Sequence, residues 1–287
     1  DEIKNRIQTL AKNEFDILIT EIGGTVGDIE SLPYIETVRQ LKFDKNQDSI
    51  VIHLTLIPFL KSTGELKTKP TQHSVKTLLQ YGVQPDILVC RSERPIGESV
   101  KNKIALFCNV QKKSVIESID TESIYNVPIL LQKQGLDIEV LKKLNIKNYK
   151  KPNLKKWNTF LNKLNSPKKE VCIAVVGKYV ELRDSYKSIF ESLIHAGVSV
   201  NCKVIVKWVH SNDLETKTIS NQFKECSGII VAPGFGGRGI QGKLNAIKYA
   251  RINNIPFFGI CLGMQMAVIE FARNVLKLKD ADSTEMN

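Results

Sequence analysis

Apolar strand-like segments alternate with amphipathic helical segments along most of this chain, and this alternation constrains its fold more than any other feature. In the first half, the strand-like runs cover residues 15–24, 49–60 and 86–92. The helical patterns that follow them cover residues 31–43, 72–82 and 99–108. Because parallel strands need a crossover connection, usually a helix, the sequence predicts an α/β fold with mostly parallel sheets.

The alternation stops between residues 146 and 169, where Lys and Asn are frequent and prolines stand at positions 152 and 167. This composition predicts an interdomain linker with one short helix near residues 157–164. The alternation then resumes with strand-like runs at 171–179, 200–210, 227–239 and 255–260. We therefore predict two domains, at residues 1–145 and 170–287, joined by the linker 146–169.

The formal charge of +11, from 41 Lys and Arg against 30 Asp and Glu, predicts an anionic partner, either a nucleic acid or a nucleotide. Much of the excess lies in lysine-rich stretches at residues 142–157 and 166–170, which are typical of solvated surface. Aromatic residues do not interleave with these lysines as they do in base-stacking proteins. We therefore expect no nucleic acid partner.

The remaining composition narrows the class of protein. The six cysteines form no C-x-x-C pair and share no short metal-binding spacing with histidine, so a zinc site is not expected. The sequence has no run of about 18 apolar residues, so no membrane span is expected. The first residues are too charged for a signal peptide. The chain starts without Met inside a helical pattern, which predicts that it is part of something longer.

One cysteine stands in the setting of a nucleophile. Gly259-Ile260-Cys261-Leu262-Gly263 has the form G-x-C-x-G between a short apolar strand and a helix, which is the thiol version of the nucleophile elbow. The helix N-terminus favours a thiolate there, and the N–H of Leu262 is placed to donate to an oxyanion. The glycine-rich loop at 232–239 also follows a strand and is expected at the same edge of the sheet. The alternative is a small thiol buried as an apolar filler.

Longer blocks of sequence carry a family resemblance. GICLGMQ and PGFGGRG, with GKYVELRDSYKSIFESLIHAG before them, closely resemble the class I glutamine amidotransferase domain of CTP synthases. TEIGGTVGDIESLPYIETVRQ, GELKTKPTQHSVKTLLQYGVQPDI and KIALFCNV resemble the synthase domain of the same enzymes. The resemblance implies a P-loop-like amidoligase domain and a flavodoxin-like class I glutaminase domain. Each is a doubly wound, mostly parallel sheet, and both are expected to be truncated here.

The resemblance also implies a reaction and its partners. CTP synthases are ligases of pyrimidine biosynthesis that aminate UTP to CTP, using ATP with Mg²⁺ and ammonia released from L-glutamine. GTP is their allosteric activator, and CTP is both product and inhibitor. They are cytoplasmic homotetramers, with no membrane or nucleic acid partner.

Residues of the first half match family positions. Glu21 matches a magnesium ligand, although a surface Glu at a strand end would look the same. The matches to the UTP/CTP site are Asp28, Ile29, Glu30, Lys67, Thr68, Lys69, Pro70, Thr71, Gln72 and Lys103. From the residues alone, Asp28 and Glu30 could simply start a helix, and Lys103 could be a solvated helix lysine. Ile119, Asp120 and Thr121 match a segment that lies against ATP, mostly through its backbone.

Local sequence suggests how the lysines of KTKPTQ are arranged. Two lysines two apart on an extended segment point the same way, so Lys67 and Lys69 can meet one triphosphate. Pro70 disfavours a helical conformation for Lys69, which supports the extended interpretation.

Residues of the second half match the glutaminase site. Cys261 would form the glutamyl thioester. The matches to residues that contact glutamine are Gly234, Leu262, Gly263, Met264, Gln265 and Glu285. One departure from the family pattern P-G-G-F-G-x-R-G is Pro233, which replaces its first glycine and has no N–H. The expected oxyanion donors are therefore Gly234 and Leu262.

Two expected parts of such an enzyme are missing. A Cys nucleophile needs a histidine base, and we expect none of His53, His73, His195 and His210 to serve Cys261. The family's His and Glu lie beyond residue 287, and its phosphate loop lies before residue 1. We therefore expect residues 1–287 alone to have neither amination nor normal glutaminase activity.

Two rival functions remain open. A different Cys hydrolase with the same fold would share the elbow but not KTKPTQ or TEIGGTVGDIES. A non-catalytic nucleotide-binding or assembly module would use the positive charge for nucleic acid instead.

Overall fold

A computed structural model describes residues 1–11, 15–44 and 49–286 of the chain. Contacts between residues divide it into two compact units, Asp1–Pro152 and Asn153–Asn287. The short helix expected in the linker is α7 (Lys155–Asn165), which packs against α8 (Lys187–Ser199) of the second unit. The Phe160 ring of α7 meets the His195 ring of α8 edge-on, with 5.6 Å between ring centroids. The division between the units therefore lies inside the predicted linker.

The first unit contains a parallel sheet of β1 (Ile52–Leu56), β4 (Ile87–Ser92) and β5 (Val115–Ile119), in the order β1-β4-β5. A short antiparallel pair, β2 (Phe59–Leu60) and β3 (Glu65–Leu66), follows β1. The strand-like runs at 49–60 and 86–92 are confirmed as β1 with β2 and as β4, whereas the alternation did not point to β5.

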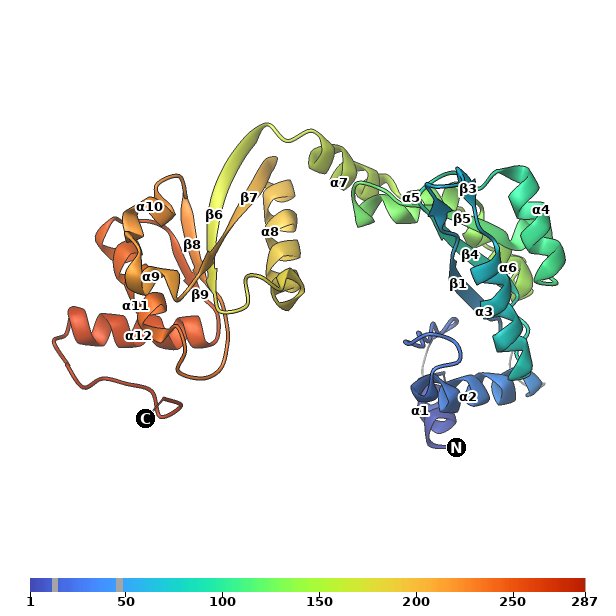
Figure 1. Ribbon diagram of the computed structural model, residues 1–287, viewed down its shortest axis with the longest axis horizontal. Coiled ribbons are helices and arrows are strands. Elements are labelled where there is room, and N and C mark those ends of the chain that lie inside the picture. Colours follow the sequence, from blue (N-terminus) through green and yellow to red (C-terminus); the bar gives the residue numbers. More distant parts are fainter. Residues whose placement is uncertain (12–14, 45–48, 287) are drawn as a thin grey trace. The chain divides into compact units, whose positions relative to one another are not determined.

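Helices cover both faces of this sheet (Figure 1). The helices of the unit are α1 (Glu2–Ala11), α2 (Leu32–Phe43), α3 (Lys69–Gln80), α4 (Gly97–Phe107), α5 (Val127–Lys133) and α6 (Leu136–Lys143). Leu88 of β4 packs in one core with Val75 of α3 and Ile104 of α4. Its neighbour Val89 packs in another core with residues of α5 and α6. Because adjacent residues of a strand point to opposite faces, the sheet is covered on both sides, as expected for a doubly wound fold.

The strand predicted at residues 15–24 is wrong. This segment forms no strand, and three of its apolar side chains are exposed, Phe15 by 63%, Ile17 by 46% and Ile19 by 88%. A strand needs partners for its backbone N–H and C=O groups, and β1 lies at the edge of its sheet with no partner in this segment among the described residues. An apolar run indicates a tendency to be buried, but it does not supply the neighbouring strand.

The extended conformation predicted for Lys69 is also wrong. Lys69 is the first residue of α3, and Thr68 before it already has helical backbone angles, with φ −85° and ψ −11°. Pro70 falls in the first helical turn, where its missing N–H would have had no partner within the helix. Pro70 disfavours a helical conformation at Lys69, but Lys69 is helical because proline fits well in the first turn of a helix.

The second unit contains a parallel sheet of β6 (Lys169–Gly177), β7 (Cys202–His210), β8 (Gly228–Val231) and β9 (Phe257–Gly259). The strand order is β7-β6-β8-β9. The remaining helices are α9 (Asp213–Thr216), α10 (Ile219–Phe223), α11 (Ile240–Ile252) and α12 (Leu262–Asn274). The strand-like runs of the second half are thus confirmed. Among the described residues, no helix is both long and apolar enough to cross a membrane.

Adjacent residues of β6 also pack in two different cores. Val176 packs with Leu244 of α11 and Met266 of α12. Val175 packs with Ile189, which lies on α8. Figure 1 shows α8 on one side of this sheet and α11 and α12 on the other. The α/β class with parallel, doubly wound sheets is therefore confirmed in both units.

The register of this sheet places three loops together. Val176 of β6 lies beside Val231 of β8, which in turn lies beside Gly259 of β9. The loops after β6, β8 and β9 therefore leave the same carboxyl edge of the sheet, where open α/β folds bind ligands.

A close contact fixes the start of α11. A Cβ atom on Gly242 would overlap the carbonyl oxygen of Ser211, which follows β7. In a helix interior, Gly→Ala usually stabilises by about 1 kcal/mol. We predict instead that Gly242→Ala lowers the free energy of unfolding of the second unit by about 1–3 kcal/mol, because backbone must move to admit the methyl group.

Urea unfolding followed by tryptophan fluorescence tests this prediction, because the only two tryptophans, Trp157 and Trp208, both lie in the second unit. Gly237→Ala is the matched control, since a Cβ there would meet no atom within 4 Å. A Gly242→Ala chain as stable as the parent would contradict the close packing.

Candidate functional site

Cys261 lies on a strained turn between β9 and α12. Its backbone angles are φ 52° and ψ −109°, a region that side-chain-bearing residues rarely adopt. Such strain persists only where the surroundings impose it, and it is frequent at active sites. The thiol is exposed, whereas Cys90 and Cys108 are buried, and burial raises the pKa of both to about 11. The alternative of a buried apolar filler is therefore wrong for Cys261.

The two glycines of the elbow are required by close contacts. A Cβ on Gly259 would lie 2.6 Å from the carbonyl carbon and oxygen of Gly263. A Cβ on Gly263 would overlap the carbonyl oxygen of Val231 on β8. Only glycine at both positions lets α12 begin directly against the sheet, and this packing holds the turn that exposes Cys261.

Side-chain donors bind the backbone carbonyl groups of the loop after β8. Lys243 Nζ donates to Ala232 O at 2.8 Å, and Tyr186 Oη donates to Pro233 O at 3.4 Å. Lys178 Nζ donates to Phe235 O at 2.7 Å and also to Gly236 O. Gly234, at the centre of the loop, has φ 149°, which favours glycine. Because these carbonyl oxygens are bound by cations and a hydroxyl, the loop has a fixed conformation.

Both lysines are buried, Lys243 with 0% and Lys178 with 3% of its surface exposed. Burial, and then the charge of Lys178, lower the pKa of Lys243 to about 8, while the charge of Cys261 opposes this shift. Burial also lowers the pKa of Lys178; the charge of Arg238 acts in the same direction and that of Glu285 in the opposite one. These mutual effects place the lysines, the thiol and Glu285 within electrostatic reach of one another.

Sequence reasoning missed both lysines, because a lysine is ordinarily read as surface. A signal existed for Lys243. It falls in helical phase with Ile247 and Ala250, four and seven residues later, which are both buried in α11. The apolar face of that helix thus begins with a lysine.

Two predicted glutamine contacts are brought together at α12. Gln265 Nε2 donates to Glu285 Oε2 at 3.0 Å, and Ser283 Oγ donates to Gln265 Oε1 at 3.2 Å. Glu285 also lines a pocket of about 570 Å³, together with Arg238 and Arg273. A carboxylate beside arginines can hold both charges of an amino acid head group.

The histidines of the second unit have other contacts. His210, at the end of β7, accepts a hydrogen bond from Asn212 N at 3.2 Å through Nδ1. His195 packs against Phe160. In the first unit, His53 bonds Ser74 at 2.8 Å, and His73 lies on α3.

Predicted nucleotide residues gather at the carboxyl edge of the sheet in the first unit. Thr71 Oγ1 donates to Leu56 O at 3.2 Å, which attaches the start of α3 to the end of β1. Lys67 Nζ bonds Glu65 at 2.7 Å. The hydrogen bond and charge of Lys67 lower the pKa of Glu65, and Lys103 adds a weaker effect. Lys103 of α4 therefore lies within electrostatic reach of the same carboxylate as Lys67.

The predicted ATP segment lies at the same edge. Ile119 ends β5, and Asp120 N donates to Ser92 O at the end of β4, at 2.9 Å. Asp120 also pairs with Arg91 at 2.8 Å. The Thr121 hydroxyl donates to Ser123 O at 2.8 Å and so tightens the turn after β5.

Glu21 and residues 28–30 lie on the surface of the first unit. Glu21, Asp28, Ile29 and Glu30 are exposed. Gly27, just before Asp28, lies close to α3, because a Cβ there would be 3.4 Å from Thr77 Cγ2. A lone exposed carboxylate such as Glu21 suits Mg²⁺, which is usually held by one or two carboxylates together with substrate phosphates. Among the described residues, no cluster of three or more potential metal ligands occurs.

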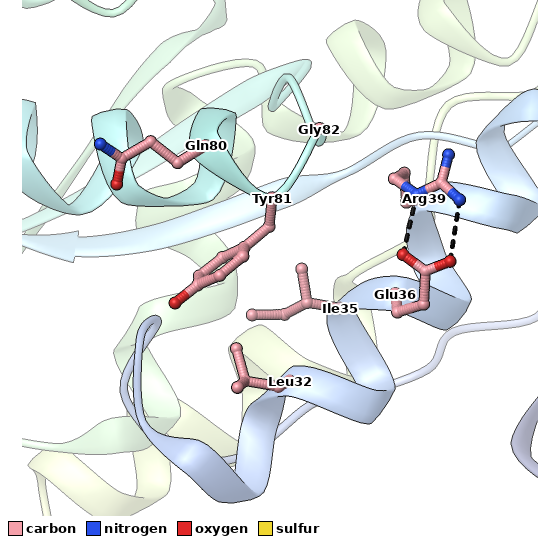
Figure 2. A pocket seen from close by; sticks show the side chains of 7 residues that line it. All are labelled: Leu32, Ile35, Glu36, Arg39, Gln80, Tyr81 and Gly82. Atoms are coloured by element: carbon pink, nitrogen blue, oxygen red, sulfur yellow. Dashed lines mark hydrogen bonds and ion pairs between the residues drawn. The ribbon is translucent and has the colours of Figure 1, made fainter.

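A separate pocket of about 460 Å³ opens between α2 and the end of α3 (Figure 2). Leu32, Ile35 and Tyr81 form its apolar wall, and Glu36 pairs with Arg39 through two hydrogen bonds of 2.8 Å. The hydrogen bond from Arg39 is the main reason why the pKa of Glu36 is lowered to about 2. None of the predicted site residues lines this pocket.

Comparisons with known proteins identify the family of the chain. Residues 1–146 match the family described as CTP synthase N-terminus, which is half of the chain. The chain belongs to the CTP synthase family. Residues 181–287, which include the elbow, match the family described as glutamine amidotransferase class-I.

Curated relatives match along the whole chain. A CTP synthase of Christiangramia forsetii is 58% identical over 289 residues, covering 100% of this chain and 53% of the relative. A CTP synthase of Flavobacterium psychrophilum is 60% identical over 289 residues, covering 100% of this chain and 54% of the relative. The solved glutaminase domain of Trypanosoma brucei CTPS with bound acivicin is 43% identical, with a TM-score of 0.38, over 41% of this chain and 46% of that one. The chain spans about half the length of the curated relatives it matches.

The low pKa of Lys243 predicts a dependence of stability on pH. The folded-state pKa of about 8 lies below the ordinary value of 10.5, so below pH 8 the buried charge opposes folding by on the order of 3 kcal/mol. This penalty is relieved as pH rises from 8 to 10.5, where only the unfolded state keeps the proton. Lys243→Met removes the charge but leaves the Ala232 carbonyl without its donor, which costs about 1–3 kcal/mol.

We therefore expect Lys243→Met to raise the free energy of unfolding of the second unit by about 1 kcal/mol at pH 7. Because the parent gains stability above pH 8, this advantage should disappear or reverse by pH 9.5. Urea unfolding at both pH values measures the difference. Lys248→Met, an exposed lysine on the same helix, is the control. A variant that is less stable than the parent by the same amount at both pH values would contradict this account.

Proposed function

We propose that the second unit carries the glutaminase activity of a glutamine-dependent CTP synthase, with Cys261 as nucleophile. The observation that carries this proposal is the exposed thiol on a strained elbow, beside a glycine loop with fixed carbonyl groups. Fold alone does not imply this chemistry, but the elbow, the loop and Glu285 together fit an amide substrate with an amino acid head group.

In the proposed reaction, Cys261 Sγ attacks the side-chain amide carbon of glutamine. The carbonyl oxygen becomes an oxyanion, which accepts hydrogen bonds from the N–H groups of Gly234 and Leu262. The C–N bond then breaks, the nitrogen takes up the proton that the thiol has lost and leaves as ammonia, and a γ-glutamyl thioester remains. Water hydrolyses the thioester to glutamate and restores the thiol. Glu285, held by Gln265, binds the ammonium of the substrate.

We assign the first unit to the amination of UTP. In this step ATP phosphorylates O4 of the uracil ring, and ammonia displaces the phosphate to give CTP. Lys67, Lys69 and Lys103 supply positive charge for the UTP triphosphate, and residues 119–121 lie against ATP. Glu21 would hold Mg²⁺, which neutralises charge on the ATP phosphates. The neighbouring positions of Lys67, Lys103 and the end of β5 at one sheet edge support this assignment.

The whole protein is proposed to work as the family does. We propose a cytoplasmic homotetramer that GTP activates and CTP inhibits, with Asp28, Ile29 and Glu30 contributing to the pyrimidine nucleotide site. The segment Thr68–Gln72 belongs to the same site through the first turn of α3.

A glutamine analogue that carries a chloroketone in place of the amide tests the nucleophile. We expect it to alkylate Cys261 at least about tenfold faster than any other cysteine, because its head group is bound beside an exposed thiol. Peptide mass spectrometry gives the rate for each cysteine, and Cys261→Ser should abolish the fast reaction. An excess of L-glutamine should slow it. Preferential labelling of Cys202 or Cys226 would refute the proposal.

Binding of UTP tests the first unit. We expect Lys67→Ala and Lys103→Ala each to weaken UTP binding by about tenfold, the typical loss for one charge-assisted hydrogen bond. Isothermal titration calorimetry measures this, with Lys76→Ala, an exposed lysine on α3, as the control. Equal losses in all three variants, or salt-dependent binding of DNA or RNA with no binding of UTP, would favour the nucleic acid alternative.

A further inference from the structure

Lys243 occupies a place that is unfavourable for a lysine in two ways. It lies in the first turn of α11, where the positive end of the helix dipole disfavours a cation. Its side chain also has no exposed surface, so the ammonium is removed from water. A methionine of similar length would avoid both costs. Ionisable groups kept in strongly perturbing surroundings are concentrated at functional sites.

The contacts of Lys243 point to the elbow. Its Nζ donates to Ala232 O at 2.8 Å, the last carbonyl before Pro233 and Gly234. The same nitrogen lies 3.8 Å from the point where a Cβ on Gly234 would be. The backbone of Lys243 is fixed as well, because Gly242 packs directly on the carbonyl of Ser211. The ammonium is thus held under the loop that faces Cys261.

We propose that Lys243 is a positioning residue for the glutaminase reaction. Its ammonium holds the Ala232 carbonyl so that the loop presents Gly234 to the oxyanion. This role rests on the proposed function of Cys261 as the nucleophile. It adds a charged group from α11 to a site otherwise built from the elbow, the loop and Glu285.

The charges around Lys243 determine how this effect depends on pH. Lys178, at the end of β6, and Cys261, at the start of α12, act directly on it. Arg238 and Glu285 act on Lys178. Because Lys243 loses its proton above about pH 8, its hydrogen bond to the Ala232 carbonyl should be charge-assisted at pH 7 and weaker at higher pH.

Alkylation of Cys261 by the chloroketone analogue of glutamine measures this hold on the loop without requiring glutaminase activity. In this reaction Cys261 Sγ displaces chloride and forms an S–C bond, and the ketone oxygen of the analogue should occupy the place of the oxyanion. The rate constant at Cys261 is followed by peptide mass spectrometry between pH 6 and pH 10. The chains compared are the parent, Lys243→Met, Lys243→Arg and the exposed control Lys248→Met.

We expect Lys243→Met to react about tenfold more slowly at pH 7, the typical loss for one charge-assisted hydrogen bond, and to approach the rate of the parent above pH 9.5, where Lys243 of the parent is neutral. Lys243→Arg, which keeps the charge, should stay within about threefold of the parent at pH 7. Lys248→Met should behave as the parent. The rate at Cys226 reports folding of the second unit, because burial raises the pKa of this thiol to about 12 and keeps its reaction slow.

The outcomes separate this proposal from the proposed function. If Cys261 of the parent reacts no faster than Cys202, the role of Cys261 as nucleophile is wrong. If Cys261 is the fastest thiol but Lys243→Met has the parent's rate and pH profile, the role of Lys243 alone is wrong. A loss of rate that is the same at every pH would indicate a purely structural lysine and would also overturn it.

Discussion

The contact of Gly263 with the carbonyl of Val231 is the constraint on which the second unit depends. It brings the first turn of α12 directly against β8, closer than any side chain would allow. Gly259 completes the same contact from β9. With both ends of the turn fixed, Cys261 has no room for an ordinary backbone conformation and takes a positive φ. The strain at one residue is thus balanced by the packing of the surrounding sheet and helix.

The glycine loop is fixed by a different means. The buried Ala232 carbonyl would be costly to leave unpaired, and two lysines and a tyrosine donate hydrogen bonds to this carbonyl and to others of the loop. The burial of two ammonium groups in one place lowers the stability of the fold. Their hydrogen bonds hold the loop in a single conformation. Stability given up at a site of this kind is a common companion of function.

The sequence predicted those parts of the structure that depend on local pattern. The elbow at Cys261 and the strands of the second unit follow from glycine positions and short apolar runs. The strand expected at Phe15–Gly24 failed because pairing depends on a neighbouring strand that no local pattern reveals. Lys69 was misjudged because a helix start tolerates proline. Lys243 was missed because burial of a lysine depends on the loop packed above it.

The central claim is that the elbow and the loop form one preorganised oxyanion site. A crystal structure of the chain alkylated at Cys261 by the chloroketone analogue of glutamine tests it most directly. We expect Cys261 to keep its positive φ and the oxygen of the bound group to lie about 2.7–3.1 Å from both Gly234 N and Leu262 N. An oxygen that points away from these two nitrogens, or an elbow relaxed to a negative φ, would contradict it.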